Sequence, residues 1–193
     1  MIRKKNRFLV YRLCFFLFFL AAVSATVPAQ ENGIDLESWN RTRLAVQRNG
    51  MIVLGSWALA NFAVSGFFMT RTQDRTYFFH QMNVFWNVVN LGIASVGLIS
   101  ALHGPVDLTL QQTLGEYRNF TRVLLINAGL DVLYITGGLL LYFKGGASEK
   151  HGTRLSGYGL SLVLQGGFLL LFDAVLAVIN SGSAGSLRAS AGL

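Results

Sequence analysis

Four long apolar stretches constrain this chain more than any other feature of its sequence. They cover residues 50–70, 78–102, 120–143 and 156–179, and none has a Lys or Arg near its middle. A helix needs about 20 mostly apolar residues to cross the hydrocarbon core of a bilayer. Only 13% of the 193 residues are charged, against about 25% in an ordinary soluble domain. The sequence therefore predicts an all-α, four-helix transmembrane bundle, and it argues against a soluble domain, a disordered chain or a nucleic-acid-binding protein.

The N-terminus has the three-part pattern of a secretory signal peptide. Residues 1–12 carry five of the 16 Lys and Arg, residues 13–23 are apolar, and small residues follow up to Ala29. This order predicts cleavage after Ala29, with Ala25 as the alternative, and an uncleaved signal anchor is the competing interpretation. We therefore expect a signal peptide at 1–29, an amphipathic lead-in at 30–48, a four-span membrane domain at 49–180 and a flexible tail at 181–193.

The loops between the spans differ in charge, and this difference predicts an orientation. The short loops after the first and third spans carry five Lys and Arg, a higher density than the segments on the other side. Cytoplasmic loops are enriched in Lys and Arg, so we expect Asp74 and Glu149 in the cytoplasm and the mature N-terminus and C-terminus outside it. A translocated N-terminus gives the same orientation. The four spans then form two helical hairpins, which could be related by duplication.

Each predicted span carries polar residues along one face. In span order these are Trp57, Asn61 and Ser65; His80, Asn83, Asn87 and Asn90; Asn127, Asp131 and Tyr134; and Tyr158, Gln165 and Asp173. The remaining faces are Leu, Val, Phe and Ile, which suit lipid. Four helices bury four such stripes by facing one another.

A polar cluster is predicted near the bilayer midplane. Asn61, Asn90, Asp131 and Gln165 lie close to the middle of their spans, and Asn87 lies on the same stripe as Asn90. Asp173 follows Gln165 by eight residues, which places it about 12 Å toward the outer side. An ionised Asp at the centre of a span costs about 2.5–3.5 kcal/mol, and no Lys or Arg lies at that depth to pair with it.

Two interpretations of this cluster remain open. In the first, the polar side chains only hold helices together, at about 0.6 kcal/mol for each pair. In the second, they form a proton relay or a pocket for a small polar ligand, because acids inside a membrane are most often functional. The candidates for relay or ligand contacts are His80, Asn83, Asn127, Tyr134 and Asp173.

Motifs for catalysis and cofactor binding are absent from the sequence. There is no Ser/His/Asp constellation, no phosphate-binding loop and no HExxH, so we expect no enzyme, no catalytic residue and no metal. His80 and His103 lie at opposite ends of one span, which disfavours a haem with two His ligands, and no other cofactor is expected. The expected partners are the lipid bilayer and either another membrane protein or a second copy of the chain.

Four segments resemble a known family. They are LGSWALAN (54–61), FHQMNVFWNVVNLGIA (79–94), NAGLDVLY (127–134) and QGGFLLLFD (165–173). They are similar to a bacterial family of four-span membrane proteins catalogued only as a domain of unknown function, over roughly residues 41–179. The resemblance implies a bacterial inner-membrane protein and no activity. We expect a small polytopic membrane protein with a polar pocket or polar helix contacts at the midplane. The alternatives are a carrier or proton-coupled module using Asp131 and Asp173, and an assembly partner of a larger membrane complex.

Overall fold

Four long helices make up the part of the chain that the structure, a computed structural model, describes, which is residues 33–148 and 150–193. The helices are α2 (Leu36–Met69), α3 (Asp74–Leu102), α4 (Leu110–Gly146) and α5 (Gly152–Ser190), and no strand occurs in these residues. Each helix is long and apolar enough to cross a membrane. The predicted all-α, four-helix membrane bundle is confirmed, whereas the predicted signal peptide lies outside the described residues.

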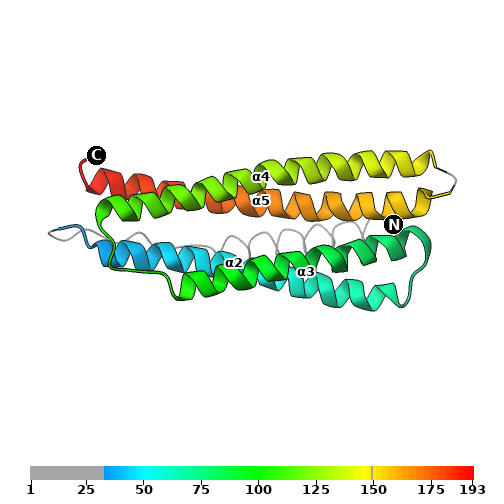
Figure 1. The fold of residues 1–193 in the computed structure, drawn as a ribbon, viewed down its shortest axis with the longest axis horizontal. Coiled ribbons are helices and arrows are strands. Elements are labelled where there is room, and N and C mark those ends of the chain that lie inside the picture. The colour runs from blue at the N-terminus through cyan, green and yellow to red at the C-terminus, as the bar shows by residue number, and fades with distance from the viewer. Residues whose placement is uncertain (1–32, 149) are drawn as a thin grey trace, which may run out of the picture.

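The helices form two antiparallel hairpins lying side by side (Figure 1). Figure 1 shows α2 beside α3 and α4 beside α5, with both hairpin turns at the same end of the molecule. We call this the turn end, and we call the opposite end, which holds the α3–α4 connection and the C-terminus, the loop end. The main helix contacts are α4 with α5, α2 with α3, and α3 with α5, whereas α3 and α4 make no extended contact.

Side-chain caps fix where two helices begin. Asp35 precedes α2 and accepts a hydrogen bond from the backbone N–H of Ser38 at 3.0 Å. Thr109 precedes α4 and forms a reciprocal capping box with Gln112, in which each side chain bonds the other residue's backbone. Such caps satisfy N–H groups that the first helical turn leaves without partners. Both caps lie at the loop end, so both hairpins have a defined start there.

Glycines let α4 and α5 approach each other closely toward the turn end. A Cβ added at Gly138 would lie 2.7 Å from the carbonyl oxygen of Gly159, and a Cβ added at Gly145 would lie 2.7 Å from that of Gly152. Gly157 plays the same part between α5 and α3, since a Cβ there would meet the carbonyl oxygen of Arg75 at 2.5 Å. Small residues allow helix backbones to pack tightly within a membrane. The helices are therefore joined most tightly on the turn side of the molecule.

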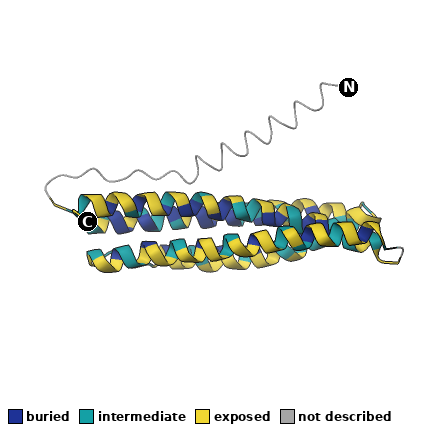
Figure 2. Ribbon diagram, turned by 90° about the horizontal axis from the view of Figure 1, so that it is seen from above, coloured by how far each residue is buried: buried dark blue, intermediate teal, exposed yellow. Residues whose placement is uncertain are grey.

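The outward faces of the helices are apolar along most of their length. Figure 2 shows exposed residues along the outer sides of the helices and buried residues concentrated on the sides that face other helices. Exposed large hydrophobic residues occur on all four helices, among them Leu59, Phe85, Leu133 and Val178. Such a surface suits lipid contact rather than water.

The loop end has a small apolar core of its own. Trp39, Tyr117 and Leu187 are buried together there, at 4%, 1% and 0% exposure. The predicted flexible tail at 181–193 was wrong over most of its length, because α5 continues to Ser190 and the Leu187 side chain anchors it. The predicted lead-in at 30–48 is likewise not a separate element from Leu36 onward, because it forms the first turns of α2.

A buried arginine, Arg43, links three segments at the loop end. Arg43 on α2 is only 2% exposed, and its guanidinium donates to Asn40 Oδ1 at 3.2 Å and to the carbonyl oxygen of Pro105 at 3.3 Å. It also contacts Glu116 Oε2 on α4 at 3.5 Å. Asn40 in turn donates to Thr113 Oγ1 at 2.8 Å. Arg43 therefore holds α2, the α3–α4 connection and α4 in one arrangement.

Candidate functional site

An amide network joins α2, α3 and α5, and Asn83 lies at its centre. Its Nδ2 donates to Asn61 Oδ1 at 3.1 Å and to Ser65 Oγ at 2.9 Å, both on α2. Its Oδ1 accepts from Ser161 Oγ at 3.2 Å and from Gln165 Nε2, both on α5. Asn83 is 3% exposed and uses both ends of its amide. This side chain therefore links three helices at once.

The network continues from Gln165 toward the middle of the bundle. Its Oε1 accepts from Trp57 Nε1 at 3.0 Å and, at a longer 3.4 Å, from Asn90 Nδ2. Asn87 lies next to Asn90 and donates to the backbone carbonyl of Asn83 at 2.7 Å. The structure thus brings Asn61, Asn87, Asn90 and Gln165 together, as the sequence predicts for this part of the cluster.

His80 closes the network on the side of the turn end. Its Nδ1 lies 3.2 Å from Ser65 Oγ, and its ring stacks on Phe68 with the ring centroids 5.4 Å apart. No group of three or more His, Cys, Asp or Glu side chains that could hold a metal ion occurs among the residues that the structure describes. Hydrogen bonding to Ser65 and stacking account for the position of His80.

Asp131 lies apart from this network, against Asp173. The two carboxyl groups, one on α4 and one on α5, are 3% and 4% exposed and are close enough to interact with each other. The sequence predicts Asp131 in one cluster with Asn61, Asn90 and Gln165, but none of these three amides donates to it in the structure. Helical side chains lean toward the N-terminus of their own helix. On antiparallel helices this lean brings Asp131 and Asp173 toward each other.

The carboxyl pair has no cationic partner in the described part of the chain. The two ion pairs found there join Arg41 to Glu37 and Arg43 to Glu116. Asp131 Oδ2 is buried and receives no hydrogen bond from any amide or hydroxyl group of the described residues. A buried polar atom without a partner is uncommon in native structures and needs an explanation.

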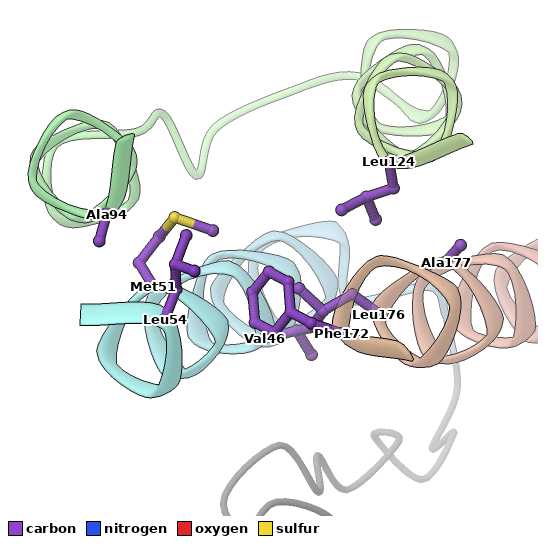
Figure 3. Close-up of a cluster of buried hydrophobic side chains, with 8 residues drawn as sticks. All are labelled: Val46, Met51, Leu54, Ala94, Leu124, Phe172, Leu176 and Ala177. Carbon is purple, nitrogen blue, oxygen red and sulfur yellow. The ribbon is translucent and has the colours of Figure 1, made fainter. Parts of the chain in front are cut away.

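A cavity of about 680 Å³ opens beside the carboxyl pair. It lies between α3 and α4, the two helices that do not pack on each other, with α2 and α5 forming its floor. In Figure 3, Ala94 on α3 and Leu124 on α4 stand on opposite sides, with Met51, Leu54 and Phe172 between them. Its polar lining consists of Asn90, Asn127, Asp131, Tyr134 and Asp173.

The cavity holds a second unpartnered polar atom. Trp86 Nε1 is buried and has no hydrogen-bond acceptor among the described residues. Its ring packs edge-on against Tyr134 at a centroid distance of 4.7 Å, and both rings line the cavity. Sequence reasoning did not select Trp86, because a single tryptophan in an apolar span is most often a packing residue. A donor from Trp86 and an acceptor from Asp131 therefore border one space.

Four apolar helices with polar groups buried between them define a multipass α-helical membrane protein. The chain belongs to a family of unknown function, DUF6992, which matches residues 53–174. The matched segment contains the amide network and both members of the carboxyl pair, and it ends directly after Asp173. No curated protein and no solved structure matches the chain.

Proposed function

We propose that this protein is a proton-coupled carrier for an apolar organic cation, which binds in the cavity between α3 and α4. The observation that carries the proposal is the buried pair Asp131–Asp173, which borders this cavity with Asp131 Oδ2 unpartnered. Two adjacent carboxyl groups in a nonpolar site resist full ionisation, so they share a proton until a cation replaces it. The residues that line the cavity indicate which kind of cation it suits.

The walls suit a molecule that is mostly apolar. Leu54, Phe172 and Leu124 face the cavity, and Trp86 and Tyr134 offer aromatic faces. Aromatic faces attract cations, and the attraction grows when the site excludes water. Because α3 and α4 do not close on each other, the ligand would enter sideways from the bilayer. The amide network, with its bonds satisfied within the bundle, serves as the fixed framework.

The proposed setting is a bacterial inner membrane, with the turn end in the cytoplasm and both mature termini in the periplasm. The support is the density of Lys and Arg in the two hairpin turns. We propose no catalysis for the protein, because its sequence carries no Ser/His/Asp constellation, no phosphate-binding loop and no HExxH motif.

A second candidate function also has a specific observation in its favour. The open side between α3 and α4 could be covered by a transmembrane helix of a partner protein or of a second copy of the chain. The protein would then be an assembly partner of a larger membrane complex.

Binding of tetraphenylphosphonium, an apolar cation, to the detergent-purified protein tests the carrier proposal. If the cation displaces one proton from the pair, its affinity should rise with pH, by up to about tenfold for each pH unit, with proton release into weakly buffered solution. Asp131→Asn and Asp173→Asn should each abolish the proton release and weaken binding. Both variants should fold at least as stably as the wild type, since a neutral amide is easier to bury than a charge.

The matched control is Asp107→Asn, which changes an exposed carboxylate in the α3–α4 connection and should bind as the wild type does. Binding by Asp131→Asn with unchanged affinity and unchanged proton release would eliminate the carrier proposal. Co-purification of a partner in fixed stoichiometry that blocks the probe would favour the assembly role instead.

A further inference from the structure

A groove at the loop end carries three arginines. It lies between α4 and α5 and has a volume of about 540 Å³. Arg118 and Arg122 line it from α4, and Arg188 lines it from α5. All three side chains are exposed, and no acidic residue lines the groove.

None of the three guanidinium groups has a counter-ion among the described residues. The ion pairs found there use Arg41 and Arg43 instead. Arg118 and Arg122 are four residues apart on one helix, and like charges at this spacing destabilise a helix by a few tenths of a kcal/mol. Three positive charges around one groove therefore favour a bound anion, and guanidinium groups bind phosphate oxygens through paired hydrogen bonds.

Hydroxyl groups complete the floor of the groove. Asn180 Nδ2 donates to Thr121 Oγ1 at 2.8 Å, and Thr121 Oγ1 lies 3.4 Å from Ser181 Oγ. One of these two hydroxyl groups donates to the other in this contact. The second hydroxyl proton is left for a ligand in the groove, which both Thr121 and Ser181 line.

The depth of the groove distinguishes a lipid from a free anion. On α4 the arginines stand where the apolar surface begins, since Val123, Leu125 and Ile126 follow directly and are 52%, 60% and 58% exposed. Leu125 and Ile126 also line the groove. Positive residues bordering an apolar band lie at the level of the phospholipid headgroups. A ligand with a phosphate at one end and an acyl chain at the other fits both parts.

We propose that this groove binds the phosphodiester headgroup of an anionic phospholipid in the leaflet at the loop end. Arg118, Arg122 and Arg188 hold the phosphate, the hydroxyl of Thr121 or Ser181 donates a hydrogen bond to it, and an acyl chain lies along Leu125 and Ile126. The site is separate from the cavity that contains Asp131, so either proposal can fail alone.

Lipid retention measured by native mass spectrometry tests this site. The protein is purified in detergent and supplied with equal amounts of phosphatidylglycerol and phosphatidylcholine. The wild type should retain phosphatidylglycerol selectively. The double variant Arg122→Gln/Arg188→Gln should lose this selectivity by about tenfold. Arg48→Gln, an exposed arginine on α2 at the same end of the molecule, is the matched control and should retain the lipid.

Competition with inorganic phosphate separates a headgroup from a free anion. Retained phosphatidylglycerol should persist in the presence of phosphate, because the acyl chain also contributes to binding. Equal retention by the double variant and the Arg48→Gln control would overturn the proposal. Displacement by phosphate together with loss of the preference for phosphatidylglycerol would overturn it as well, in favour of a site for free anions.

Discussion

At the scale of single residues, two kinds of buried polar side chain behave differently in this protein. An amide has both a donor and an acceptor, so Asn83 can satisfy itself against α2 and α5 together. An ionised carboxylate has only acceptors, so Asp131 and Asp173 cannot satisfy each other without a proton. The membrane-spanning helices therefore hold both an amide that is fully hydrogen-bonded and a carboxyl oxygen, Asp131 Oδ2, that is not.

Asn83→Leu should destabilise the bundle more than any other single amide substitution. It removes four side-chain hydrogen bonds, and at about 0.6 kcal/mol each the expected loss is about 2 kcal/mol. Thermal or denaturant unfolding in detergent measures it. Asn119→Leu, at an exposed position on α4, should change the stability little. Equal stability of the two variants would show that the network does not hold the helices.

At the scale of helices, the tight glycine contacts decide how α4 and α5 pack. Gly138 is buried and faces the backbone of α5, whereas its neighbour Gly137 has no atom within 4 Å of an added Cβ. These adjacent glycines therefore have different roles, which sequence alone does not separate.

Gly138→Ala should push α4 and α5 apart, because the new methyl group would lie 2.7 Å from the carbonyl oxygen of Gly159. Overpacking of this kind destabilises by about 1–3 kcal/mol. Gly137→Ala adds the same methyl group in open space and should leave stability unchanged or slightly raised. Unfolding midpoints of the two variants in the same detergent give the comparison, and a lower midpoint for Gly137→Ala would contradict the assigned packing.

Much of the fold and part of the site could be predicted from the sequence. Apolar stretches and helical periodicity predict the four spans and the faces that meet, which placed Asn61 near Gln165. The contact between Asp131 and Asp173 does not follow from counting residues along each helix, which gives only the depth of the backbone. The direction in which each side chain leans also decides which groups meet. Composition and periodicity do not predict the burial of Arg43 or the helical tail, because both depend on tertiary contacts. Arg43 is held by hydrogen bonds to Asn40, Pro105 and Glu116.

The tail is held by Leu187, which packs with Trp39 and Tyr117.

At the scale of the whole molecule, the two ends differ in charge and in structure. The turn end has two short connections, 70–73 and 147–151, whereas the loop end has a longer connection and an apolar core. The distribution of Lys and Arg predicts that the turn end is cytoplasmic.

Single-cysteine labelling tests this orientation in a Cys14→Ser background, which removes the native thiol. A cysteine at Ser186 or Gln111, exposed at the loop end, should react with a membrane-impermeant thiol reagent in intact cells. A cysteine at Gln73, exposed in the α2–α3 turn, should react only after the cells are opened. Labelling of the Gln73 site in intact cells would reverse the orientation.

The length of α5 places one continuous helix in two solvents. Its 39 residues extend about 58 Å, nearly twice the roughly 30 Å hydrocarbon thickness of a bilayer. In water, release of ordered solvent drives apolar side chains such as Leu187 together, whereas within lipid that force is absent and packing and hydrogen bonds take its place. Urea weakens the first kind of cohesion. Backbone hydrogen exchange under mild urea should therefore be faster around the Trp39–Tyr117–Leu187 core. The backbone N–H groups near Asn83 should stay protected.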